Sequence, residues 1–153
     1  MLREKLAPIS RFKNMSKHRL QLDDEYEFLA FGLSCHLKDY RVAWLLSRAL
    51  RLDFLRTMVS PSSNGADSAA YAKFMGKDED KHLNYIILSN QNEDAYLFKE
   101  FKQYDFFILV EGYIDIFDTS SFIDLLQNIE SFQFVSAMDK RKFNKIQYAL
   151  FEE

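Results

Sequence analysis

Residues 105–113, Asp-Phe-Phe-Ile-Leu-Val-Glu-Gly-Tyr, are the segment that most constrains the fold. Successive side chains of a strand point to opposite faces, and both alternating sets are apolar from Phe106 to Val110. This pattern predicts a strand covered on both sides, in the middle of a sheet. The composition agrees, because the chain holds 15 Phe and 8 Tyr beside only 4 Gly and 2 Pro, and aromatic residues favour strands.

Shorter segments of strand and turn character surround this strand. We expect strands at 17–22, 26–35, 69–75, 83–89, 95–98 and 133–138. Gly, Asn and Asp residues supply the turns between them. Residues 58–68 combine Ser, Pro, Asn and Gly, which predicts a loop.

Helical spacing appears in three places. Residues 38–52 bring Val42, Leu45, Leu46 and Ala49 to one face. Residues 118–121 offer several N-cap candidates for a helix with apolar residues at 122, 125, 126 and 129, and a short basic helix is expected from residue 139 onward.

These elements predict a single α+β domain at residues 15–153, with two or three helices on a mostly antiparallel sheet. Residues 1–14 carry four basic and one acidic side chain without useful periodicity, and we interpret them as a loose N-terminal arm or an upstream extension.

Charge and cysteine content narrow the functional classes. The net charge is −3, and residues 58–153 hold nine basic and sixteen acidic side chains, so no basic stretch of the kind typical of nucleic-acid binders dominates. A single cysteine excludes an intramolecular disulfide and suits a reducing compartment, which favours the cytoplasm. No apolar run approaches the ~18–20 residues that span a bilayer, so we expect no membrane partner.

Motifs for metal, nucleotide or nucleophilic chemistry are missing from the sequence. The Cys and His residues lack zinc-ligand spacing, the four glycines form no phosphate-binding loop, and there is no GxSxG. We therefore expect no metal, no cofactor and no catalytic residues, and a protein that is not an enzyme. Cys35 is interpreted as a core residue rather than a reactive thiol, which would need a neighbouring histidine and acid.

One helix edge carries a more specific pattern. On the helix predicted at 38–52, Arg41, Trp44, Arg48 and Arg51 project close together beside the apolar face. Arginine and tryptophan together bind phosphates, stack on rings, or form protein–protein hot spots. A solvated helix edge whose Trp packs under a neighbouring strand is the favoured alternative.

The segment Phe98-Lys99-Glu100-Phe101-Lys102-Gln103-Tyr104-Asp105-Phe106 resembles the motif that names the IPExxxVDY family, small bacterial proteins of uncharacterised function. Glu100 and Asp105 match the motif at its spacing, whereas Lys99 replaces its proline. The resemblance extends more loosely from Met15 to the C-terminus and implies a compact cytoplasmic domain without an assigned reaction. The two acids either anchor the backbone at the start of the central strand, which we favour, or face a partner.

Two functional hypotheses follow, and a small enzyme whose polar groups meet only in three dimensions is a third, weaker one. The first is a non-enzymatic binding or scaffold domain that binds a protein partner or itself, in the second case as a homodimer, because the composition is aromatic-rich and no catalytic motif assembles. The second is an RNA-associated or anion-binding protein that uses Arg41, Trp44, Arg48 and Arg51.

Overall fold

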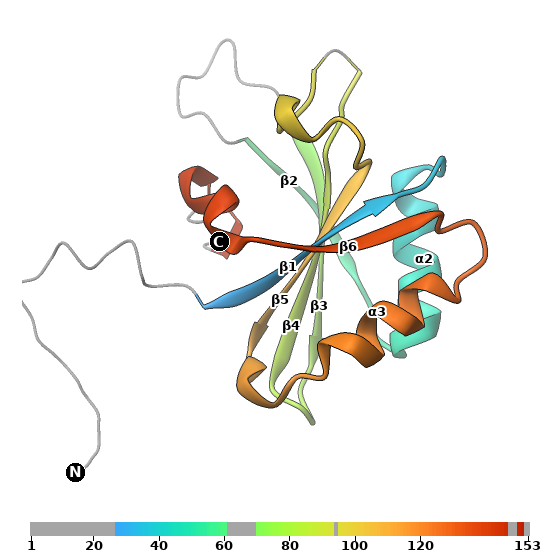
Figure 1. The fold of residues 1–153 in the computed structure, drawn as a ribbon, viewed down its shortest axis with the longest axis vertical. Coiled ribbons are helices and arrows are strands. Elements are labelled where there is room, and N and C mark those ends of the chain that lie inside the picture. Colours follow the sequence, from blue (N-terminus) through green and yellow to red (C-terminus); the bar gives the residue numbers. More distant parts are fainter. Residues whose placement is uncertain (1–26, 61–69, 94, 147–149, 152–153) are drawn as a thin grey trace, which may run out of the picture.

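The computed structural model describes residues 27–60, 70–93, 95–146 and 150–151. Six strands form one sheet in the order β2-β3-β4-β5-β1-β6, and every neighbouring pair is antiparallel (Figure 1). The α+β class and the single domain predicted from the sequence are confirmed. The elements are β1 (Phe28–Ser34), α2 (Asp39–Leu50), β2 (Leu55–Val59), β3 (Tyr71–Asp78), β4 (Leu83–Ser89), the 3-10 helix η3 (Lys99–Phe101), β5 (Phe106–Gly112), the 3-10 helix η4 (Ile114–Ile116), α3 (Thr119–Gln127), β6 (Phe134–Met138) and the 3-10 helix η5 (Lys140–Ile146).

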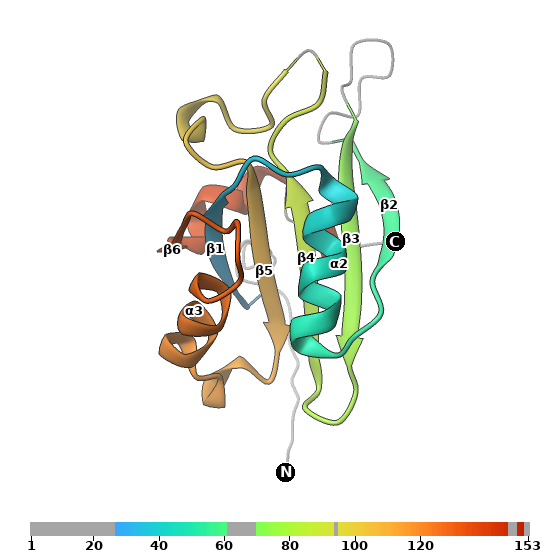
Figure 2. The ribbon, with the colours of Figure 1, turned by 90° about the vertical axis from the view of Figure 1, so that its right-hand side faces the viewer.

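The sheet is covered on both faces. Helices α2 and α3 lie on one face, and η5 lies on the other (Figures 1 and 2). One apolar cluster joins alternate strand residues to Val42, Leu46, Phe122 and Leu126 of the two helices. A second cluster joins the other set to residues that follow β6, including Phe143. Each face is therefore a separate hydrophobic core.

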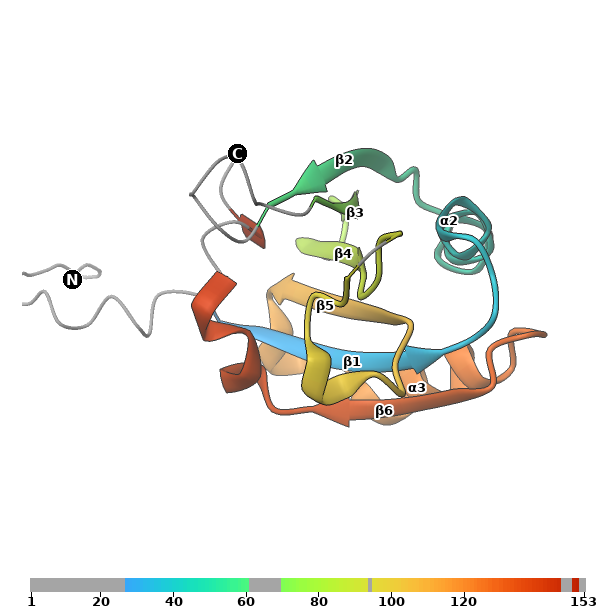
Figure 3. The same cartoon turned by 90° about the horizontal axis from the view of Figure 1, so that it is seen from above.

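Strand β5 lies between β4 and β1, and residues 106–110 are all buried. Phe107 belongs to one core and Ile108 to the other, which confirms the central strand predicted from two apolar sets. Strands β2 and β6 form the two edges of the sheet (Figure 3).

The two α-helices begin and end for identifiable reasons. Helix α2 buries Val42, Ala43 and Leu46, and it ends at Arg51, whose φ of 59° is left-handed and whose N–H donates to the Ser47 carbonyl. Helix α3 begins after Asp118, whose carboxylate accepts the Ser121 N–H at 3.1 Å. Among the four N-cap candidates at 118–121, Asp118 is the cap.

Two expectations about individual segments are wrong. Residues 55–59 form strand β2, although the loop was predicted to begin at 58; four of the five residues are exposed, so the strand carries no alternating apolar pattern. Residues 95–98 form no strand, only an isolated bridge between Gln91 and Tyr96, because Asn90 binds this part of the backbone with its side chain.

The predicted arm at 1–14, the strand predicted at 17–22 and most of the loop predicted at 58–68 lie outside the described residues.

Candidate functional site

The Arg–Trp cluster on α2 brings together three of the four predicted residues. The Trp44 side chain is 46% exposed. The Cζ atom of Arg41 lies 4.8 Å from the centroid of its ring, and that of Arg48 lies 4.9 Å away. The two guanidinium groups, one from each neighbouring turn, are thus held over the indole by cation–π contact.

Arg51 does not belong to this cluster. It follows the last turn of α2, and it lines a depression of about 360 Å³ together with Asp78, Glu79 and Asp80. Lys77 also lines the depression, but the three carboxylates outnumber the two basic groups and oppose the binding of an anion. The predicted set of four therefore divides into a Trp-centred group and one Arg in acidic surroundings.

The two acids of the Glu100–Asp105 motif have different environments. An Asp105 carboxylate oxygen accepts the Cys35 N–H at 2.8 Å, and the Asp105 N–H donates to the Leu33 carbonyl at 2.9 Å. Asp105 thus joins the start of β5 to the end of β1, the geometry that a structural anchor requires. Glu100 is exposed on η3, and within the described ranges it makes no hydrogen bond or ion pair.

Asn90 is a key residue, although its position between the strands predicted at 83–89 and 95–98 indicates only a turn. It is fully buried, and its side-chain oxygen accepts the Phe98 N–H at 2.8 Å. Its amide group donates to the carbonyls of Phe101 at 3.0 Å and Tyr104 at 2.9 Å. Asn90 therefore organises the loop that carries the motif. The one available signal was an amide residue directly after the apolar strand 83–89.

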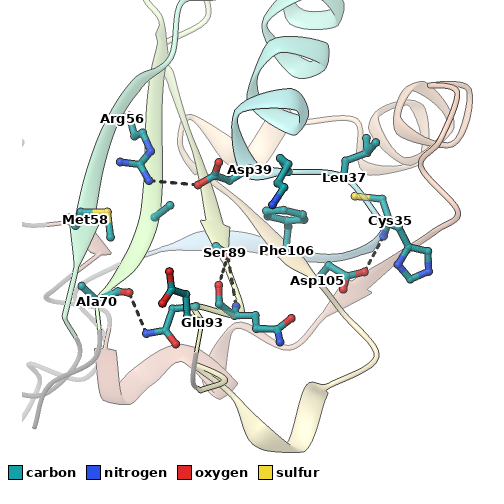
Figure 4. A pocket seen from close by; sticks show the side chains of 15 residues that line it. Cys35, Leu37, Asp39, Arg56, Met58, Ala70, Ser89, Glu93, Asp105 and Phe106 are labelled. Atoms are coloured by element: carbon teal, nitrogen blue, oxygen red, sulfur yellow. Dashed lines mark hydrogen bonds and ion pairs between the residues drawn. The ribbon is translucent and has the colours of Figure 1, made fainter.

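A polar cavity of about 880 Å³ lies at the end of the sheet where α2 begins (Figure 4). Its half-buried carboxylates already have partners within the chain. Asp105 accepts the Cys35 backbone N–H, and Asp39 forms an ion pair with Arg56 at 3.4 Å. Ser89 donates to the Gln91 carbonyl at 2.8 Å, and Asn92 donates to the Ala70 carbonyl at 3.2 Å.

Cys35 lines this cavity but is not an activated nucleophile. Burial raises the pKa of its thiol to about 11; a backbone hydrogen bond at Leu37 lowers it, and the nearby Asp105 carboxylate raises it further. Figure 4 shows the sulfur atom on the side of Leu37, away from that carboxylate. Neither His36 nor His82 hydrogen-bonds the thiol among the residues described, so the cysteine is held as a protonated core group.

An apolar groove of about 600 Å³ lies at the opposite end of the same face. We define it by the apolar residues that line it, namely Leu50, Leu83, Tyr85, Phe117, Phe122 and Leu125. Tyr113 and Ile116 also line it and are largely exposed. Its residues come from three separate stretches of the chain, namely Leu50, residues 80–85 and residues 113–125, so no sequence pattern identifies it.

The β2 edge is a further exposed apolar feature, which we define as the side of Leu55–Val59 that pairs with no strand in the described part of the chain. Leu55 is 76% exposed and Met58 is about half exposed. Arg56 is the single charged residue of this strand, and it is turned toward Asp39 of α2.

No group of three or more His, Cys, Asp or Glu side chains within the described ranges is arranged to hold a metal ion. None of the helices in the described part of the chain is long and apolar enough to cross a lipid bilayer. No protein-family model matches the chain, and no curated protein matches its sequence. The resemblance to the IPExxxVDY family therefore depends on the residues quoted above.

Proposed function

We propose that this protein is a non-enzymatic binding domain that self-associates through the β2 edge. The observation that carries the proposal is the exposure of four consecutive residues, Leu55 to Met58, on an edge strand. Unpaired N–H and C=O groups on such a strand are a template for pairing with another chain. Natural edge strands are usually protected by charge or proline, and the sole charge on β2 is engaged by Asp39.

A second copy fits this edge by antiparallel pairing centred on Thr57. In that register, Leu55 faces Val59 of the other copy and Arg56 faces Met58. No like charges lie directly opposite each other, and both exposed apolar side chains of the strand gain cross-strand contacts. The product is one continuous sheet of twelve strands with two-fold symmetry.

Light scattering during size-exclusion chromatography tests the proposal. At high micromolar concentration we expect twice the 18.1 kDa of one chain. Thr57→Lys places two lysines opposite each other across the two-fold axis and should yield a monomer. Ala137→Lys adds the same charge to the exposed side of β6 and should remain dimeric. A monomeric wild type, or a dimer that tolerates Thr57→Lys, contradicts the proposal.

A second candidate function is RNA or anion binding by the Arg–Trp cluster, supported by the two guanidinium groups positioned over Trp44. Because the protein's own arginines already occupy the indole, the cluster suits phosphate contacts better than base stacking.

Filter binding of single- and double-stranded RNA at low salt tests this candidate. Retention should fall steeply with salt, and it should fall more with Arg41→Ala than with Arg51→Ala, because Arg51 lies in acidic surroundings. No retention of either RNA dismisses it.

We also propose membership of the IPExxxVDY family and a cytoplasmic location. The supports are Glu100 and Asp105 at the motif spacing, and a lone cysteine that is buried.

A further inference from the structure

The apolar groove is distinct from the β2 edge and contains no residue of that strand. It lies between the end of α2, the start of α3 and the turn that joins β3 to β4. Figure 2 shows both helices in front of the same face of the sheet, with β5 between them. At about 600 Å³, its volume falls within the range of small-molecule sites.

The Tyr85 hydroxyl is the unusual group in this groove. The residue is 4% exposed, yet its hydroxyl makes no hydrogen bond to any part of the chain that the structure describes. Its ring packs against Phe122, with centroids 5.9 Å apart. The buried Tyr71 and Tyr104 hydroxyls also make no hydrogen bond within the described ranges, so what distinguishes Tyr85 is that it lines a groove in which a ligand would supply the partner.

The hydroxyl is held in its donor form. Burial raises the pKa of Tyr85, and the Asp78 carboxylate raises it further. The phenol therefore stays protonated at neutral pH and offers an O–H to an acceptor.

Close backbone and ring contacts hold the mouth of the groove. The His82 and Tyr113 rings lie against each other with centroids 4.8 Å apart, and the Tyr113 N–H donates to the His82 carbonyl at 3.1 Å. His82 has a φ of 57°, and Gly112 has a φ of 113° where any side chain would collide with the His82 carbonyl. This close backbone approach fixes the aromatic pair, so the opening is formed in advance.

The charged side chains at the mouth are two carboxylates, Asp80 and Asp118, and one lysine, Lys81. Asp80 and Lys81 are adjacent and opposite in sign. The Asp118 carboxylate is already bound by the backbone N–H and the hydroxyl of Ser121. A charged ligand would lose its hydration in the groove without a dedicated counter-charge.

We propose that the apolar groove binds a small uncharged molecule with an apolar body and a carbonyl-type oxygen, which accepts a hydrogen bond from the Tyr85 hydroxyl. The apolar body packs among Phe117, Phe122 and Leu125, and the oxygen enters toward Tyr85.

Two matched probes test this assignment, namely benzophenone, which carries a carbonyl between two rings, and diphenylmethane, which lacks it. Amide chemical shifts of the isotope-labelled protein report the dissociation constant of each probe and the place where it binds. We expect benzophenone to shift the amides of residues 80–85, 113–117 and 121–125.

Tyr85→Phe isolates the hydrogen bond. The ratio of the diphenylmethane to the benzophenone dissociation constant should fall by about three- to tenfold in this variant. The cost of desolvating the carbonyl is the same in both proteins, so it cancels when the ratio for Tyr85→Phe is compared with the ratio for the wild type. Tyr104→Phe removes a buried hydroxyl outside the groove and should leave the ratio unchanged.

Leu125→Trp fills the groove from α3 and should weaken the binding of both probes, provided that its spectrum remains that of a folded protein. Three outcomes overturn the proposal: no groove shifts with benzophenone up to its solubility limit, shifts located elsewhere, or a ratio that Tyr85→Phe leaves unchanged.

Discussion

The polar cavity and the apolar groove lie at opposite ends of the same helix-covered face, and they differ in how their polar groups are satisfied. The polar cavity is larger and holds more charged groups, yet its buried and half-buried side chains all have partners, such as Asp105 with Cys35 and Asp39 with Arg56. The apolar groove has few polar groups, and the hydroxyl of its buried Tyr85 makes no hydrogen bond with the described residues. The ligand site that we propose is therefore distinguished from the polar cavity by an unpartnered hydroxyl, not by volume or charge.

The largest expected effect comes from Asn90, which lies between two residues of the polar cavity, Ser89 and Gln91. Asn90→Ala removes a hydrogen-bond partner from each of three backbone groups, two of them buried, and should lower the free energy of unfolding by about 2–4 kcal/mol. Urea denaturation measures it. Asn84→Ala, which removes one half-buried bond to Glu111, should cost only about 1 kcal/mol. Equal losses would show that the polar end is not held by this network.

Cys35 tests whether the polar cavity contains a reactive group. With a thiol pKa near 11 instead of 9.0, the thiolate fraction at slightly alkaline pH should be about 100-fold lower than for a free thiol, and disulfide-exchange reagents should label the folded protein correspondingly slowly. Because the folded-state pKa is raised, the associated stability is complete below pH 9 and is lost as the pH rises through about 11.

Protein unfolded in urea is the control for this labelling and should react at the free-thiol rate. Fast labelling of the folded chain would contradict the interpretation of Cys35 as an inert core group.

Asp105→Asn should have a moderate effect, because the amide oxygen can still face the Cys35 N–H but without its charge. We expect a loss of about 1–2 kcal/mol and a melting temperature lower by several degrees, measured by calorimetry. Glu100→Gln, at the other acid of the motif, should leave the melting temperature unchanged because Glu100 is exposed. An unaffected Asp105→Asn would direct attention to binding.

The smallest expected effect is at Tyr85. Tyr85→Phe removes a hydroxyl that has no partner among the described residues, so stability in the absence of a ligand should change by less than about 0.5 kcal/mol or should rise. Thermal denaturation measures this change in stability, with Asp105→Asn as the comparison. A marked loss would mean that the groove, like the polar cavity, satisfies its own polar groups.

Much of the fold was predictable because local signals agree with the tertiary structure. Phe107 and Ile108 predict a strand that is buried on both faces, and Asp118 predicts the start of α3. Strand β2 escaped prediction because its exposed edge position imposes no alternation from Leu55 to Met58. The conformation of the loop that carries the motif could not be predicted, because Asn90 holds it through hydrogen bonds to residues up to fourteen positions away.

The candidate sites likewise divide into those that local sequence predicts and those that depend on contacts between distant segments. Arg41, Trp44 and Arg48 lie one helical turn apart, so their proximity follows from helix geometry. Arg51 lies apart from this cluster because it is itself the left-handed residue that ends the helix. The acids beside it come from the distant turn between β3 and β4. The apolar groove needs three separate stretches of the chain to meet, which only the tertiary structure provides.

The burial of the single cysteine also makes this chain a convenient background for site-directed labels. A cysteine introduced at Leu55 or at Ser121, both exposed, would carry a spin label or fluorophore while the native thiol stayed silent. One probe would then report interchain distances, and the other the entry of a small molecule, without any prior mutation of the core.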